Sequence, residues 1–307
     1  MSQKVSIIGG AGRVGSSAAY ALQLGRSCAE IVLVDAAGEA AQGEALDLTH
    51  GRAAVGGPQI RAGDYSAVAG SEVVVVTAGS RRKPDESRLQ LTERNVALFR
   101  QLIRSVQAAA PEAILLVVTN PVDVLTYLAA SELGWPPKQT IGLGTVLDTL
   151  RFRSLLGARL NLDASRIEAL ILGEHGDSMV PIWSRAQVGG VALASCPGFS
   201  DALGREVFAE VKAAGAEMIR LKSGAAYAIG LCVRDVVHAI ARDARRPLPL
   251  STLQAGAYGI DGTCLSLPTV IGRAGALGVL EPALAAEEVA ALQASAQVLR
   301  ETMAGIA

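Results

Sequence analysis

The sequence predicts an α/β protein, with a doubly wound parallel sheet followed by a second part of α+β architecture. One observation is a series of short β-branched runs, at residues 5–8, 31–34, 73–77 and 114–119. Another is the helical spacing of apolar residues between the last two runs, at Val96, Phe99, Ile103 and Val106. Strands that alternate with helices at this interval are typical of a parallel sheet covered by helices.

The first predicted strand, at residues 5–8, leads directly into a glycine-rich turn and then into a predicted helix at residues 16–24. The turn fits the pattern GxGxxG, with its glycines at Gly10, Gly12 and Gly15. Such glycines permit a tight turn, close approach of the backbone to a pyrophosphate and tight packing of the helix on the strand. The start of the helix adds free N–H groups, so we expect a Rossmann-type dinucleotide site here.

The second predicted strand, at residues 31–34, ends at Asp35, about 20 residues beyond Gly15. In dinucleotide-binding units an acidic residue at this place hydrogen-bonds the ribose hydroxyls of the adenosine. A carboxylate would also repel a 2'-phosphate, so the expected cofactor is NAD rather than NADP. The alternative is that Asp35 only caps a turn before Gly38.

Two further predicted strands end at Thr77-Ala78-Gly79 and Thr119-Asn120-Pro121, where cofactors bind in such sheets. The segment at residues 80–88 then contains Arg81, Arg82, Lys83 and Arg88, together with a proline, but no aliphatic side chain. Because it cannot bury itself, we expect an exposed loop or a lid that closes over an anionic substrate. The alternative is an ordinary solvated run of charges.

The composition loosens from Ile141, and we expect a domain boundary near residues 142–144. This divides the chain into a cofactor domain at residues 1–142 and a substrate domain at residues 143–307. The second part is expected to contain helices at residues 145–156, within 202–240 and at 287–303, and strands at residues 167–172 and 265–271.

A candidate catalytic residue follows the predicted strand at residues 167–172, in the segment Gly173-Glu174-His175-Gly176-Asp177. A histidine at a strand end can exchange a proton near neutral pH, since its ordinary pKa is about 6.5. Asp148 and Arg151 lie three residues apart and share one face of a predicted helix. They could supply an acid and a carboxylate clamp to the same cleft. The alternatives are a structural histidine in a turn and a surface ion pair of little value.

The composition argues against several other classes of protein. A net charge of -1 and a pI near 6.3 leave no basic excess for nucleic acid or anionic membranes. No apolar run approaches the roughly 20 residues of a membrane helix, and the run at residues 5–8 is too short for a secretory signal. The four cysteines show no metal-ligand spacing, so we expect no metal, no disulfide framework and a cytoplasmic location.

With these motifs in order, the chain resembles the lactate/malate dehydrogenase family along essentially its whole length. The matching stretches are GGAGRVG, IVLVD, VVVVTAG, the KPxxSR of the loop, VVTNPVD, VLDTLRFR and LGEHGDS. The family reaction is reversible hydride transfer between NAD and a 2-hydroxy acid. The resemblance further implies a homo-oligomer, with a tetramer favoured over a dimer.

The resemblance also implies roles for individual residues. His175 looks like the proton donor and acceptor, and Asp148 resembles its carboxylate partner. Arg151 matches the residue that grips the substrate carboxylate, and Arg88 the loop arginine that polarises the reacting carbonyl. Asn120 resembles a residue that contacts both the substrate and the cofactor. We expect the cofactor site to contain Gly10, Gly12, Arg13, Val14, Gly15, Asp35, Thr77, Ala78, Gly79, Asn95 and Asn120.

The family separates malate from lactate enzymes largely at one loop position, which is Arg82 here. An inward-facing Arg82 would pair with the second carboxylate of oxaloacetate, so we expect an L-malate dehydrogenase of the tricarboxylic acid cycle. An L-lactate or broader 2-hydroxy-acid dehydrogenase is the alternative, because Glu86 and the segment at residues 144–148 resemble bacterial lactate enzymes and Asp85 could draw Arg82 outward. A non-catalytic NAD-binding protein is a remote third reading.

Overall fold

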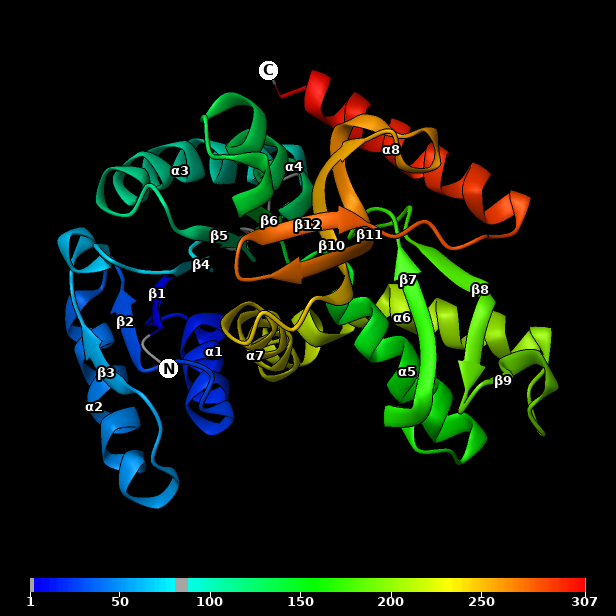
Figure 1. The fold of residues 1–307 in the computed structure, drawn as a ribbon, viewed down its shortest axis with the longest axis horizontal. Coiled ribbons are helices and arrows are strands. Elements are labelled where there is room, and N and C mark those ends of the chain that lie inside the picture. The colour runs from blue at the N-terminus through cyan, green and yellow to red at the C-terminus, as the bar shows by residue number, and fades with distance from the viewer. Residues whose placement is uncertain (1–2, 81–87, 307) are drawn as a thin grey trace.

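The computed structural model describes residues 3–80 and 88–306, and within them most strands join one nine-stranded sheet (Figure 1). Its order is β12-β11-β10-β6-β5-β4-β1-β2-β3. The six strands of the first half pair in parallel; they are β1 (Lys4–Ile8), β2 (Glu30–Val34), β3 (Gln59–Ala62), β4 (Val73–Val76), β5 (Ile114–Val117) and β6 (Thr140–Gly142). The Rossmann-type doubly wound sheet is therefore confirmed.

The central strands of this sheet are buried on both faces, which explains why they read as unbroken apolar runs. In β4, Val73 and Val75 join the core on one face, whereas Val74 and Val76 join the core on the other. The first face is covered by α1 (Arg13–Gly25), α2 (Gly38–Val55) and α7 (Tyr227–Ala241), and the second by α3 (Arg88–Ala109) and α4 (Val122–Tyr127). The predicted apolar face of α3 is confirmed, since its four residues at helical spacing are buried.

The second half extends the same sheet and adds a smaller one. Antiparallel strands β10 (Arg246–Ala255), β11 (Asp261–Gly272) and β12 (Gly275–Val279) continue it beyond β6. A separate antiparallel sheet is formed by β7 (Ile167–Leu172), β8 (Val180–Val188) and β9 (Val191–Ala192). The remaining helices are α5 (Val146–Leu160), α6 (Asp201–Lys222) and α8 (Ala286–Ala304). The α+β architecture predicted for this half is confirmed, and the boundary near residue 142 stays a prediction.

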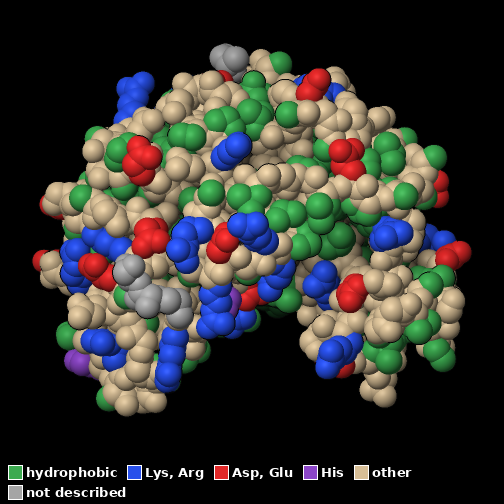
Figure 2. Space-filling model, viewed as in Figure 1, with side chains coloured by type: hydrophobic (Ala, Val, Ile, Leu, Met, Phe, Trp, Pro, Cys, Tyr) green, Lys and Arg blue, Asp and Glu red, His purple; other side chains and the backbone are tan. Residues whose placement is uncertain are grey.

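The surface carries both signs of charge. On the face drawn in Figure 2, Lys and Arg side chains lie among Asp and Glu side chains, with apolar side chains between them. Among the described residues, no helix is long and apolar enough to cross a membrane. In the same part of the chain, no group of His, Cys, Asp and Glu side chains is arranged to hold a metal ion.

Candidate active site

The glycine turn is built so tightly that side chains would not fit it. The N–H groups of Gly9 and Gly10 both donate to the Val34 carbonyl of β2, at 2.8 and 3.1 Å. A Cβ on Gly15 would lie 2.2 Å from the carbonyl oxygen of Gly9, a backbone atom that cannot move aside. A Cβ on Gly12 would lie 3.1 Å from the same oxygen. The absence of these carbons lets α1 begin directly against the turn, as binding of a pyrophosphate requires.

Asp35 lies next to this turn, at the end of β2. Its carboxylate accepts the N–H of Ala11 and the N–H of Ala37, each at 3.0 Å. The carboxylate thus caps the turn after β2, and it also ties the glycine turn to the end of the strand. Asp35 is only partly buried. Its position beside the turn is the one that a ribose-binding carboxylate takes in dinucleotide-binding sheets.

The ends of β4 and β5 are tied together by Asn95 of α3. Its amide oxygen accepts the Ser80 N–H at 2.8 Å, and its amide nitrogen donates to the Asn120 carbonyl at 2.9 Å. Thr77 donates through its hydroxyl to the Ile8 carbonyl at 3.0 Å. The buried Asn95 therefore holds the cofactor edge of the sheet in place, and the side chain of Asn120 is exposed at that edge.

Arg13 connects the glycine turn to the second half of the chain. Its guanidinium donates to the Gly224 carbonyl at 2.8 Å, between α6 and α7. A surface pocket beside the start of α1 is lined by Arg13, Ser16, Ser17, Lys222, Ala226 and Tyr227. Two cations and three hydroxyls next to free helix N–H groups suit the phosphates of a dinucleotide.

His175, Asp148 and Arg151 meet at the buried start of α5. The Nδ1 atom of His175 lies 2.5 Å from Oδ2 of Asp148, and Nη1 of Arg151 donates to Oδ1 of Asp148 at 3.1 Å. The Asp148 side chain is 1% exposed, whereas those of His175 and Arg151 are 19% and 17% exposed. One carboxylate thus orients both the imidazole and the guanidinium, and both remain open to a ligand.

This arrangement favours the protonated form of His175 and the ionised form of Asp148. Burial alone would lower the pKa of His175, but the charge and hydrogen bond of Asp148 raise it above its ordinary value. Burial alone would raise the pKa of Asp148, but the charge and hydrogen bond of His175, with the charge of Arg151, lower it. An imidazolium and a carboxylate therefore stabilise each other here.

The turn that carries His175 is held by backbone contacts to distant elements. Gly173 exchanges two hydrogen bonds with Ser266 of β11, each 2.9 Å. Its φ of +86° suits glycine, and a Cβ there would lie 2.9 Å from the Ser295 hydroxyl. The Glu174 N–H donates to that hydroxyl at 2.9 Å. Strand β11 and helix α8 thus fix the position of the turn that carries His175.

The next N–H of the turn, that of His175, donates to Oδ2 of Asp123 at 2.8 Å. Asp123 lies in the first turn of α4 and is 3% exposed. Asp123 lies in the motif TNPVD but is not among the predicted site residues. A carboxylate two residues into a helix that follows a cofactor strand is the signal that could have identified it.

Part of the predicted site lies outside the described residues. Arg82, with its neighbours Arg81 and Asp85, belongs to residues 81–87, and the side chain of Arg88 at the start of α3 is likewise not among the described ones. The remaining predicted catalytic and substrate residues are His175, Asp148, Arg151 and Asn120. The first three are brought together, whereas no hydrogen bond among the described residues joins Asn120 to His175. The other two histidines are elsewhere: His50 is exposed on α2, and His238 lies near the Ser27 hydroxyl.

Two family models match the chain: the NAD-binding domain of lactate/malate dehydrogenase at residues 3–142 and its α/β C-terminal domain at residues 145–307. The chain belongs to the lactate/malate dehydrogenase family. It is an NAD-dependent dehydrogenase of the lactate/malate type, and the glycine turn has the shape that this cofactor needs.

Similar proteins and structures agree on one substrate class. The L-lactate dehydrogenase of Gloeobacter violaceus is 45% identical over 302 residues, which cover 97% of this chain and 92% of that protein. The L-lactate dehydrogenase of a Synechococcus species is 43% identical, with 99% of both chains covered. The crystal structure of a minor L-lactate dehydrogenase from Enterococcus mundtii superposes on this chain with a TM-score of 0.95 at 33% identity. The match covers 100% of this chain and 99% of that one.

These relatives correct the prediction of a malate dehydrogenase. That prediction was wrong because it relied chiefly on one loop residue, Arg82, and on the assumption that its side chain points into the site. Similarity over nearly the full chain to proteins named L-lactate dehydrogenase favours the lactate alternative. The features at residues 144–148 that resemble lactate enzymes agree with it.

Proposed function

We propose that the protein is an L-lactate dehydrogenase, which interconverts pyruvate and L-lactate with NADH and NAD. The observation that carries the proposal is the shared carboxylate of Asp148, which orients an imidazole and a guanidinium toward one partly open site. A 2-keto acid offers a carbonyl oxygen to the imidazole and a carboxylate to the guanidinium. The lactate dehydrogenases among its relatives support this choice of acid.

In this proposal His175 moves the proton. Because Nδ1 faces Asp148, the free nitrogen is Nε2, and it would donate to the carbonyl oxygen in pyruvate reduction and accept the proton back in lactate oxidation. Arg151 would bind the substrate carboxylate with the guanidinium N–H groups that Asp148 leaves free. Arg88 and Asn120 keep their predicted roles at the carbonyl and at the cofactor side. Arg82 has no second carboxylate to bind on pyruvate.

The cofactor would lie across the carboxyl ends of the parallel strands. When bound, the nicotinamide supplies or accepts the hydride. The turn residues would hold its pyrophosphate and Asp35 its ribose, and the strand ends would line its nicotinamide side. The complete proposed set is Gly10, Gly12, Arg13, Val14, Gly15, Asp35, Thr77, Ala78, Gly79, Asn95 and Asn120.

The substrate is tested by following NADH oxidation with pyruvate beside oxaloacetate. We expect kcat/KM to be at least about tenfold higher for pyruvate, which corresponds to about 1.4 kcal/mol. A preference for oxaloacetate would contradict the proposed substrate while leaving the family intact. No turnover with either acid would favour the non-catalytic reading, which the assembled His175 site argues against.

The pH dependence follows from the raised pKa of His175. Pyruvate reduction requires the imidazolium, so its rate is expected to hold beyond pH 6.5, the ordinary pKa, and to fall as the pH rises through the raised value. Lactate oxidation requires the neutral imidazole and should increase over the same range. Profiles of kcat/KM in both directions measure this. A reduction rate that already declines below pH 6.5 would be inconsistent with it.

We also propose a cytoplasmic homo-oligomer, with a tetramer favoured over a dimer. Large apolar side chains on the adjacent helices α1, α2 and α7 are exposed, which is common at subunit interfaces. They are Tyr20, Leu24, Leu46, Tyr227 and Leu231. The division into domains at residues 1–142 and 143–307 belongs to the same proposal.

A further inference from the structure

Asp123 is a buried carboxylate that the proposed mechanism does not use. One of its oxygens, Oδ2, accepts the His175 N–H at 2.8 Å. The other, Oδ1, is buried and makes no hydrogen bond of good geometry among the described residues, although the Ser251 hydroxyl of β10 lies close enough to act on the carboxylate. A single backbone N–H could be satisfied by a neutral amide or hydroxyl, which would avoid the cost of burying a charge. The carboxylate therefore calls for an explanation beyond this one hydrogen bond.

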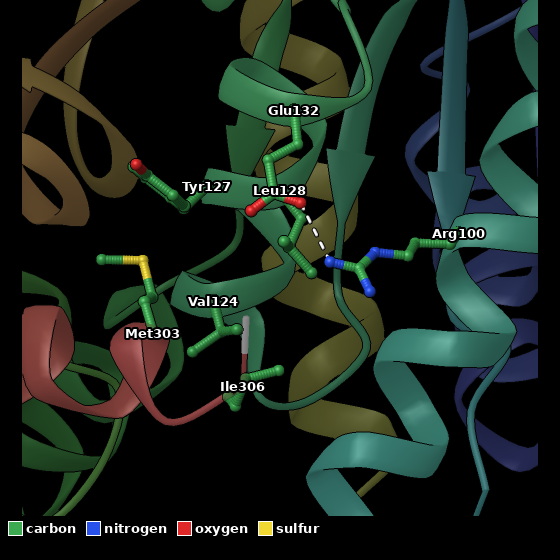
Figure 3. Close-up of a pocket in the computed structure, with 7 residues that line it drawn as sticks. All are labelled: Arg100, Val124, Tyr127, Leu128, Glu132, Met303 and Ile306. Atoms are coloured by element: carbon green, nitrogen blue, oxygen red, sulfur yellow. Dashed lines mark hydrogen bonds and ion pairs between the residues drawn. The ribbon is translucent and has the colours of Figure 1, made fainter.

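The position of Asp123 is fixed from several sides. Helix α4 begins at Val122 and continues into the π-helical turn Leu128–Glu132. In Figure 3, Val124 and Leu128 of this segment line a small pocket together with Met303 and Ile306, which lie near the C-terminus. Arg100 of α3 donates a hydrogen bond to Glu132 at 2.9 Å. The buried Val124 and Leu125 fix the place of α4 in the fold, and Asp123 lies on the side of this helix that reaches the His175 turn.

The surroundings of Asp123 place its titration near neutral pH. Burial raises its pKa to about 6, while the Ser251 hydroxyl of β10 and the N–H and charge of His175 act to lower it. Glu174 of the same turn raises it, and the buried Cys264 of β11 also faces this charge. On the other side, His175 faces Asp148 and Arg151 as well as Asp123.

We propose that Asp123 is a positioning residue for the proton transfer by His175, because it fixes the backbone of His175 and places a second buried negative charge beside its imidazole. Asp148 binds the imidazole ring of His175, and Asp123 binds its backbone N–H, so carboxylates fix both the side chain and the main chain of this histidine. This inference rests on the proposed function, because it assigns Asp123 to the reaction that His175 performs. The inference has a further consequence for pH dependence. When Asp123 takes up a proton near pH 6, it loses its negative charge and no longer stabilises the imidazolium of His175.

The first test compares Asp123→Asn with the native enzyme. The asparagine oxygen can still accept the His175 N–H, but the charge is gone, so the imidazolium is less stabilised. We expect the alkaline limb of the pyruvate-reduction profile to move to lower pH by about half a unit or more, with KM for NADH unchanged. A limb displaced by less than about 0.2 unit would overturn the proposal.

Glu288 offers a matched control. It is a second buried carboxylate that accepts backbone N–H groups, those of Trp183 at 2.7 Å and Ser184 at 2.9 Å, on strand β8. Glu288→Gln removes a buried charge of the same kind from a place that does not face His175. We expect its pH profile to match the native one. An equal displacement in both variants would show a general effect of losing buried charge and would overturn the proposal.

A second measurement needs neither turnover nor a folded Asp123 variant. The native chain has three histidines, and His175→Asn identifies the imidazole NMR signal of His175 among them. In the native protein we expect this signal to show its own titration and a smaller inflection near pH 6, where Asp123 ionises. A curve without that inflection would overturn the proposal. Because the measurement is independent of activity, failure of the proposed function and failure of this inference are distinguishable.

Discussion

Replacing His175 by asparagine is expected to lower kcat for pyruvate reduction by about a thousandfold or more while leaving NADH affinity nearly unchanged. Asparagine is of similar size and can keep a contact with Asp148, but it has no group that exchanges a proton near neutral pH. The cofactor turn lies on a different part of the sheet and does not contact His175 through any hydrogen bond of the described residues. Steady-state kinetics and fluorescence titration with NADH measure the two quantities.

His50→Asn is the control for this substitution, because His50 is exposed on α2. It should retain native kcat and native NADH affinity. Retained turnover in His175→Asn would refute the assignment of proton transfer to His175. A parallel loss of NADH binding would show instead that the substitution had damaged the fold.

The second large effect is expected at the cofactor turn. Gly15→Ala should raise the dissociation constant for NADH by about a hundredfold, or about 2.7 kcal/mol. The new methyl group would lie 2.2 Å from the Gly9 carbonyl oxygen, so α1 must move away from the turn and carry its free N–H groups with it. Gly12→Ala, with a closest distance of 3.1 Å, should show a weaker effect in the same direction.

Gly43→Ala provides the matched control within another helix, α2. A Cβ there meets nothing within 4 Å, so NADH affinity should stay native. Because alanine loses less backbone entropy than glycine in a helix, stability should increase by about 0.5 to 1 kcal/mol. Thermal unfolding measures that change. Native NADH affinity in Gly15→Ala would mean that the cofactor does not bind at this turn.

The strands of the parallel sheet that the sequence predicted share one property, burial on both faces. Strands β1, β2, β4 and β5 are unbroken apolar runs, and such runs are visible in the sequence. Strand β3 was missed because the exposed Gln59 and Arg61 alternate with buried positions over only four residues. Strand β10 was missed because Pro247 and Pro249 argue against a strand, although the sheet accommodates them.

The candidate site divides in the same way. His175, Asp148 and Arg151 could be named because each lies in a short motif whose chemistry is local. Asp123 and Ser295 were missed, because their hydrogen bonds to the His175 turn span 52 and 121 residues of sequence. The choice of acid failed for a different reason: it depended chiefly on Arg82, a single loop residue that lies outside the described residues.

The joint between β6 and β10 has a consequence for synthesis of the chain. Strand β6 is fully buried, and one of its two neighbours in the sheet is β10, which pairs with it through Ser251 and Gly142. This neighbour is synthesised long after β6. A nascent chain that has completed its parallel strands therefore presents an open strand edge until more than a hundred further residues have been made. Open edges of this kind recruit other chains. The first half is thus expected to depend on prompt completion of the second, and a fragment ending at residue 142 should aggregate.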